Sequence, residues 1–300
     1  MNTFYYRLKN KSRDLFAATL LMNSPFSAYS YFRNRKDGLN VGMFKSGKYK
    51  FVARKLDWVG VREVFFEDEY RILKKIDLGT KSPKIVDLGS NIGGFAISAF
   101  NCWPIASVIS VEAAQDTFEI LKKNRGINQE LDWHVVHAGV WNSDGELVLD
   151  RKDISIGHRV SDSEKGERIP SMTLGTILNN QGWNGVELMK MDIEGAEEVV
   201  IPAIANLLKD ISVLIIEVHT DRIDPAKVYS VLKQSFNYCW QLNDRSSSKP
   251  VLVLSNTNYQ DIGMSAVDVH LLGPVSYTHL RAHETLTPIA YAVFCLIRGG

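Results

Sequence analysis

The sequence lacks several features that would assign it to a specialised class. Its 300 residues contain only three cysteines, Cys102, Cys239 and Cys295, which lie far apart and form no CxxC pair. Zinc knuckles and disulfide frameworks need closely spaced or paired cysteines, so both are disfavoured and a reducing, cytoplasmic setting is expected. No uninterrupted apolar run is long enough for a bilayer, so no membrane span is predicted.

An excess of charge of one sign is also missing. Lys and Arg total 35, Asp and Glu total 34, and the formal net charge is +1. Nucleic-acid-binding proteins usually carry a basic excess, so no nucleic-acid partner is predicted, although a neutral sum can hide a local patch. Hydrophobic residues make up 45% and charged residues 23%, which is typical of a folded protein and excludes a largely disordered or collagen-like chain.

Residues 1–80 form an aromatic-rich leader. Its start places basic residues before a short apolar stretch, but Asp14 interrupts that stretch and no clear cleavage site follows, which favours an amphipathic helix over a signal peptide. Residues 41–56 contain two strand-like runs around a turn, which predicts a hairpin, and residues 63–76 have helical character. The leader is a candidate lid, together with the polar residues 150–171, which predict an exposed loop.

After residue 80 short apolar runs alternate with amphipathic segments. This alternation predicts a parallel sheet that is covered by helices on both faces. The expected strands are 84–89, 107–112, 132–140, 143–150, 186–194, 211–219, 238–243 and 250–256. The expected helices are 93–103, 115–126, 172–180, 196–208 and 225–236.

The last 26 residues do not continue this pattern. They begin abruptly after a plausible end at Pro274, and the string SYTHLRAHET resembles a translated adaptor or vector sequence. We expect residues 275–300 to be a non-native tail and exclude them from the functional argument. The alternative is that residues 289–297 form a real strand. The predicted organisation is therefore the leader followed by one domain over residues 81–274.

Four of the expected strands turn acidic near their carboxyl ends. Central strands of a buried parallel sheet are normally almost continuously apolar, and open α/β sheets bind ligands outside the carboxyl ends of their strands. Acids gathered on that rim repel one another unless a ligand, a cation or a proton compensates them. The rim is therefore the predicted site. Its acids are Asp87, Glu112, Asp192 with Glu194, and Glu217.

The first acidic strand leads into the glycine-rich turn VDLGSNIGG. Gly89 and Gly93 permit a tight turn and a close approach of the backbone to a ligand, and a helix begins directly afterwards. Asn91 stands where the dinucleotide fingerprint has its middle glycine, so a cofactor with an amino-acid end fits better than a pyrophosphate. Asp87 is expected to meet an ammonium group, and Glu112, which follows 25 residues later, to accept both ribose hydroxyls. The alternative is a purely structural glycine turn.

The third acidic strand carries the sequence LMKMDIEGAE. In an extended strand Lys190, Asp192 and Glu194 point to one face, and the charge of Lys190 is expected to keep Asp192 ionised. The alternative is a buried Lys–Asp pair that only fixes the strand register. Glu217 and His219 on the following strand also share a face, which makes His219 either a candidate general base or a structural histidine.

The sequence contains the blocks IVDLGSNIGGFAISAF, VISVEAAQDTFEILKKN, HAGVWNSDG, LMKMDIEGAEEVVIPAIANLL and LIIEVH. Taken together, they resemble the FkbM family of S-adenosylmethionine-dependent methyltransferases over about residues 60–220. The resemblance implies a class I methyltransferase fold, which is a doubly wound, Rossmann-like α/β fold with a seven-stranded, mostly parallel sheet whose last strand is antiparallel. It also implies O-methylation of a hydroxyl on a sugar, a glycan or a natural product. The sequence departs from the family at VEAAQ, where an acid followed by proline is common.

The resemblance divides the candidate residues into a cofactor group and an acceptor group. The cofactor group consists of Asp87, Gly89, Asn91 and Gly93 at the methionine part, Glu112 at the ribose, and Ala138 and Gly139 at the adenine. The acceptor group consists of Asp192, Glu194 and His219, with Lys190 as a supporting charge.

The leading hypothesis is in-line methyl transfer to an oxygen, with His219 or Asp192 removing the hydroxyl proton. A variant of it uses a divalent cation held by Asp192 and Glu194. Two alternatives from other classes are a catalytically silent module that binds cofactor or glycan, and an NAD-linked oxidoreductase. The acids Asp192 and Glu194 argue against the silent module, because a module that only binds does not need them. Asn91 in place of the middle glycine argues against the oxidoreductase. Trp58 and Trp183 are the tryptophans expected to be exposed platforms for a sugar acceptor.

Overall fold

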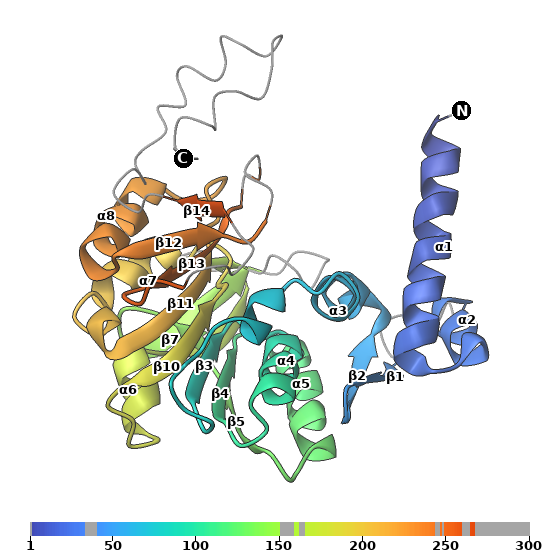
Figure 1. Cartoon of the computed structure of the whole chain (residues 1–300), viewed down its shortest axis with the longest axis horizontal. Coiled ribbons are helices and arrows are strands. Elements are labelled where there is room, and N and C mark those ends of the chain that lie inside the picture. The colour runs from blue at the N-terminus through green and yellow to red at the C-terminus, as the bar shows by residue number, and fades with distance from the viewer. Residues whose placement is uncertain are drawn as a thin grey trace.

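The computed structural model describes residues 2–33, 41–150, 159–161, 166–243, 247, 249–259 and 265–267. The expected non-native tail, residues 275–300, lies outside the described residues. Within the described ranges, no helix is both long and apolar enough to cross a bilayer. Figure 1 shows a layered α/β body with the first helices standing at one side of it.

The leader begins with two helices, α1 (Asn2–Met22) and α2 (Pro25–Arg33). The predicted hairpin is confirmed as β1 (Val41–Ser46) paired antiparallel with β2 (Tyr49–Arg54). A short 3-10 turn, η1 (Lys55–Asp57), then leads into α3.

The helical character predicted for residues 63–76 is confirmed only in part. α3 (Trp58–Phe65) begins earlier and ends early, and only a short 3-10 turn, η2 (Arg71–Lys74), follows. Asp68 adopts a φ of 55° between the two, which breaks a right-handed helix.

The main sheet runs along the order β14-β12-β13-β11-β10-β3-β4-β5. Neighbouring strands from β11 to β5 are parallel, and β13 is antiparallel to both β11 and β12. The predicted seven-stranded, mostly parallel sheet with an antiparallel last strand is confirmed, and β14 adds a short edge strand. The strands are β3 (Lys84–Leu88), β4 (Ser107–Glu112), β5 (Asp132–His137), β10 (Val186–Met191), β11 (Ile211–Glu217), β12 (Tyr238–Gln241), β13 (Val251–Ser255) and β14 (Ser265–Val267).

Helices cover both faces of this sheet, as the alternating pattern predicts. Alternate strand residues send their side chains to opposite faces, so Ile85 joins one buried core and Val86 the other. The first core contains α4 (Gly94–Cys102), α5 (Gln115–Ile127) and much of the leader. The second contains α6 (Leu174–Asn179), α7 (Glu197–Ala203) and α8 (Pro225–Ser235), and η3 (Leu208–Asp210) joins it through Leu208.

The expected exposed loop over residues 150–171 is wrong in part. A second sheet has the strand order β6-β9-β7-β8, and β9 (Glu167–Met172) pairs with β7 (Gly145–Asp150). Its other members are β6 (Gly139–Val140) and β8 (Arg159–Ser161).

The leader packs directly on the sheet domain. Tyr70 meets the ring of Phe95 edge to face, and Tyr49 meets that of Phe100 in the same way, with both phenylalanines on α4. The expectation that Trp58 and Trp183 are exposed platforms is wrong, because only 5% and 8% of their surfaces are exposed. Large aromatic rings bury more apolar area than other side chains, and both rings serve the core instead.

Candidate active site

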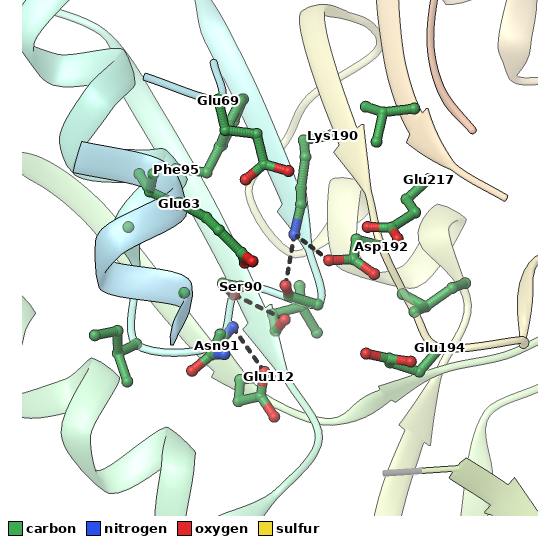
Figure 2. A pocket seen from close by; sticks show the side chains of 18 of the residues that line it. Glu63, Glu69, Ser90, Asn91, Phe95, Glu112, Lys190, Asp192, Glu194 and Glu217 are labelled. Atoms are coloured by element: carbon green, nitrogen blue, oxygen red, sulfur yellow. Dashed lines mark hydrogen bonds and ion pairs between the residues drawn. The ribbon is translucent and has the colours of Figure 1, made fainter. Parts of the chain in front are cut away.

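A cavity of about 470 Å³ opens where β3, β4, β10 and β11 end. Its lining joins the turn after β3, the end of β4, the DIEG segment after β10 and residues of the leader. The predicted rim is therefore a hollow rather than a flat surface. Figure 2 shows carboxylates converging on it from several elements around the amine of Lys190.

The glycine turn after β3 is held in a conformation that only glycine tolerates. Gly89 has a φ of 73°, and a Cβ there would lie 1.7 Å from the carbonyl oxygen of Asp192. Gly93 has a φ of 90°, and a Cβ there would lie 2.6 Å from the ring of Trp133. The amides of Gly89 and Ser90 both donate to the carbonyl of Val111, which ties the turn to β4. The turn is therefore fixed against two neighbouring strands.

Glu112 stands at the end of β4 with its carboxylate beside the same turn. One oxygen accepts the amide N–H of Asn91 at 2.8 Å, and the other accepts that of Ala114 at 2.9 Å. Burial raises the pKa of Glu112 to about 7 even though both amides oppose the shift. Each carboxylate oxygen has a second lone pair, so the group can still accept two hydroxyl hydrogen bonds.

Lys190 lies beneath the cavity and holds the turn from below. Its Nζ donates to the carbonyl of Gly89 at 2.6 Å and lies 3.5 Å from Asp87 and 3.7 Å from Asp192. Asp87 is completely buried, and burial raises its pKa to about 6 against the opposing charge of Lys190. Asp87 therefore acts on the cavity through Lys190 and the turn.

A second group of acids surrounds the other end of the cavity. Burial, followed by the charge of Asp192, raises the pKa of Glu217 to about 8. From the leader, Glu69 has its pKa raised to about 7, mainly by burial and then by the charge of Glu63. Figure 2 shows Glu63 and Glu69 pointing toward Lys190 and Asp192. Glu217 and Glu69 retain protons more readily than ordinary carboxylates because they are buried next to other acids.

His219 lies under the DIEG segment and is only 1% exposed. Its Nδ1 is 2.9 Å from Glu197 and its Nε2 is 3.1 Å from Glu194. Burial lowers its pKa, but the hydrogen bonds to Glu194 and Glu197 outweigh that and raise it to about 10. The imidazole is therefore protonated at neutral pH and occupied at both nitrogens. This environment is that of a positioning residue for Glu194.

The structure brings most predicted site residues to the cavity and leaves three behind its wall. Asp87 and Gly93 of the cofactor group, and His219 of the acceptor group, do not line it. Sequence reasoning missed the leader acids and a polar group from the segment between β12 and β13, because nothing in the local pattern marks them. The predicted residues that line the cavity are Gly89, Asn91, Glu112, Ala138, Gly139, Lys190, Asp192 and Glu194. The missed ones are Glu63, Glu69, Tyr70, Asn243, Ser247 and Lys249.

Within the described residues one group of side chains is spaced to hold a metal ion. It consists of Asp192, Glu194 and His219, whose ligand atoms lie within 4.8 Å of one another. Binding there would require His219 to give up a proton and its contact with Glu194. Asp192 and Glu194, the predicted cation ligands, therefore have His219 beside them, but both nitrogens of His219 already contact glutamates.

Comparison with known proteins finds methyltransferases, both as a family model and as a single relative. A methyltransferase FkbM domain model matches residues 87–238, which is just over half of the chain. Hexuronic acid methyltransferase AglP of Haloferax volcanii is 28% identical over 156 residues, covering 50% of this chain and 61% of that relative. The chain thus spans less than two thirds of the length of this curated relative.

Solved structures show the same kind of likeness at low identity. Methyltransferase FkbM from Methylobacillus flagellatus is 13% identical with a TM-score of 0.43, covering 67% of this chain and 55% of that one. TrmK of M. capricolum, solved with S-adenosyl-homocysteine, is 12% identical with a TM-score of 0.38, covering 64% and 69%. With the family model matching from the glycine turn through β11 and beyond, the chain belongs to the FkbM family of methyltransferases.

Proposed function

We propose that this chain is an S-adenosylmethionine-dependent O-methyltransferase that acts on a hydroxyl of a sugar, a glycan or a natural product. One observation carries the proposal. A single cavity joins the turn at Gly89 and the carboxylate of Glu112 to the carboxylate of Asp192. Family membership implies the cofactor, and the second carboxylate supplies what a proton-removing step needs.

The residues of the cavity fit this cofactor. S-adenosylmethionine supplies, when bound, an electrophilic methyl group on a cationic sulfonium. The free lone pairs of Glu112 suit the ribose hydroxyls, and Ala138 and Gly139 line the same cavity, where the adenine would lie. The Oδ1 of Asn91 is buried without a hydrogen-bond partner, so it can accept from the amino-acid end. Asp87 and Gly93 support this end from behind.

Asp192 is the residue that we assign to proton removal. Its Oδ1 is buried without a hydrogen-bond partner, so it can accept from a hydroxyl, and its Oδ2 lies 3.7 Å from the amine of Lys190. His219 is a weaker choice because both of its nitrogens are engaged and it carries a proton at neutral pH. Its role is to position Glu194, and Lys190 holds Asp192 and the turn in one arrangement.

A sugar acceptor is supported by the curated relative, whose name assigns it a hexuronic acid. The leader, residues 1–80, would form the lid over residues 81–274, since Glu63 and Glu69 line the acceptor end of the cavity. We place the protein in the cytoplasm, as its three widely spaced cysteines predict.

The direct test is calorimetry with S-adenosylmethionine, followed by transfer of a labelled methyl group to pooled glycans and free sugars. Binding with transfer is expected, and a chelator is expected to leave transfer unchanged because His219 is already engaged. Binding without transfer to any pool would indicate the catalytically silent module. Loss of transfer on chelation, restored by Mg²⁺, would support the cation held by Asp192 and Glu194. Binding of NADH in place of S-adenosylmethionine would indicate the oxidoreductase.

A further inference from the structure

The near-zero charge of the chain hides a strong separation along the sequence. Residues 1–50 contain ten lysines and arginines but only two acidic residues, a net charge of +8. The remaining 250 residues therefore carry a net charge of −7. The basic segment comprises α1, α2, most of the hairpin and the residues between them, whereas the lining of the acidic cavity begins only at Asp57.

Exposed apolar side chains are concentrated in the same part of the chain. Twelve large hydrophobic residues are exposed among the described residues, and nine of them lie between residues 15 and 59. Scattered single exposures are normal on a protein surface, but a concentration of this kind marks an interaction surface. The nine are Leu15, Phe16, Leu20, Phe26, Tyr29, Val41, Met43, Leu56 and Val59.

Both helices pack partly inward and leave large apolar side chains exposed. The ring of Phe16 also touches Phe66 at its edge. On α1, Ala17 and Ala18 are fully buried, whereas Phe16 and Leu20, one turn apart, are 59% and 58% exposed. Phe26, in the first turn of α2, is 80% exposed. Figure 1 shows α1 and α2 at the edge of the molecule, with α1 extending beyond the body of the fold. Among the side chains that the structure describes, each of the two helices therefore carries exposed apolar residues.

From this arrangement we infer that the helices α1 and α2 dock the protein on an anionic lipid surface. Helices that lie on a membrane combine an outward apolar face with surrounding lysine and arginine. The apolar side chains enter the boundary between headgroups and acyl chains, and each basic residue near the surface adds about 1 kcal/mol of attraction. No span of the bilayer is involved.

Other occupants fit these observations less well. In a symmetric dimer through this face, two segments of net charge +8 would lie against each other, and like charges repel. A nucleic acid would satisfy the basic residues, but its phosphate backbone offers nothing to the aliphatic side chains of Leu15 and Leu20. An anionic bilayer complements both the charge and the apolar faces.

The docking face is only one helix away from the cavity. Arg62 on α3 forms an ion pair with Asp14 on α1 at 3.1 Å. The next residue, Glu63, lines the cavity. Docking would hold the mouth of the cavity near the lipid surface, although the docking itself does not depend on what the cavity catalyses.

The test is flotation of the full 300-residue chain with vesicles of phosphatidylcholine that contain phosphatidylglycerol, against vesicles of phosphatidylcholine alone. Binding is expected only to the anionic vesicles and is expected to weaken at high salt. The double variant Phe16→Ser and Phe26→Ser is expected to bind at least about tenfold more weakly, because two exposed aromatic rings are removed. The variant Lys11→Gln and Arg33→Gln, which removes one exposed basic residue from each helix, is expected to bind about five- to thirtyfold more weakly.

Matched controls lie outside the docking face. Ile105→Ser with Ile127→Ser removes two exposed apolar side chains, and Lys81→Gln with Lys209→Gln removes two exposed charges, and neither should change binding. All variants keep residues 275–300, so any contribution of that segment cancels. The inference would be overturned by equal binding to both kinds of vesicle or by equal losses of binding in the controls. It would also be overturned if no vesicles were bound and the protein were instead a dimer that dissociates in the Phe16→Ser, Phe26→Ser variant. So would nuclease-sensitive binding to RNA with none to vesicles.

Discussion

The two walls of the cavity are built in different ways. The cofactor wall, which comprises the turn at Gly89–Asn91 and Glu112, is held by backbone hydrogen bonds from β3 and β4. The acceptor wall, which comprises Asp192, Glu194, Glu217, Glu63 and Glu69, is assembled from three separate parts of the chain. Asp192 and Glu194 lie beside the side chains of Lys190 and His219, and Glu217 and Glu69 are buried close to other acids.

This difference indicates which wall can change. The cofactor wall depends on glycine conformations and close backbone contacts, so most substitutions there should fail. The acceptor wall depends on side chains from the leader and from two strand ends, so its chemistry can vary without altering the sheet. One fold can then keep its cofactor and serve different acceptors.

The substitution Gly89→Ala should have the largest effect on this comparison. The new Cβ would lie 1.7 Å from the carbonyl oxygen of Asp192, and the φ of 73° is strained for alanine. We expect a loss of about 3 kcal/mol or more of unfolding free energy and no measurable cofactor binding. Thermal unfolding and calorimetry measure the two effects.

Gly79→Ala is the matched control for this prediction. Gly79 has a φ of 69°, but a Cβ added there would have nothing within 4 Å, so only backbone strain is introduced. A cost of about 1 kcal/mol is expected there. Equal costs at both positions would mean that the contact between Gly89 and Asp192 is unimportant, and the two walls would then be independent.

Asp192→Asn should have the next largest effect, and it should act on the acceptor wall alone. The amide keeps the size of the side chain but cannot take a proton from a hydroxyl. We expect methyl transfer to fall by about 10²- to 10⁴-fold with cofactor affinity nearly unchanged. Asp210→Asn, at the exposed last residue of η3, is the control and should transfer at the normal rate. Full transfer by the Asp192→Asn enzyme would exclude Asp192 as the base.

The cofactor wall could be predicted from the sequence because its parts are local. Gly89, Asn91 and Gly93 occupy one short turn, and Glu112 ends the next strand, so spacing alone places them together. The acceptor wall could be predicted only in part. Glu63 reaches the cavity because α3 packs beside the glycine turn, which is a tertiary contact with no local signal.

Two misjudged segments have related causes. The polar stretch before Met172 lacks a strong apolar pattern, but β9 still forms because β7 offers it a partner edge. The stretch over residues 63–76 has helix-forming residues throughout, yet Asp68 adopts a φ of 55° and η2 buries Ile72 and Leu73 in the core. In both cases tertiary contacts outweighed local propensity.

Glu112→Gln should produce a smaller effect, confined to the cofactor wall. The amide group replaces one acceptor oxygen by a donor, so one contact to the amide of Asn91 or Ala114 is lost along with a ribose contact. Cofactor affinity measured by calorimetry should fall by about 10- to 100-fold, with a smaller effect on transfer at saturating cofactor. Glu119→Gln, exposed on α5, is the control. A change in transfer without a change in affinity would place Glu112 on the acceptor side instead.

The smallest expected effect concerns Glu217 and the pH dependence of stability. Its pKa is raised from 4.5 to about 8 in the folded protein, so the folded state holds a proton that the unfolded state releases. The stability of the wild type is therefore complete below about pH 4.5 and falls as the pH rises toward 8. Glu217→Gln removes this loss.

The melting temperatures of the two proteins should therefore agree near pH 5 and diverge as the pH rises, with the Glu217→Gln protein about 2–4 °C higher near pH 8. Glu187, on β10 at the opposite end of the sheet from the cavity, accepts the amide of Lys84, and Glu187→Gln should show no gain with rising pH. If the Glu217→Gln protein and the wild type followed the same pH curve, burial beside the other acids of the acceptor wall would not destabilise ionised Glu217.

A cationic ligand should reduce this difference in melting temperature, because a positive charge beside Glu217 favours its ionised form. S-adenosylmethionine added at pH 8 should therefore raise the melting temperature of the wild type more than that of the Glu217→Gln variant.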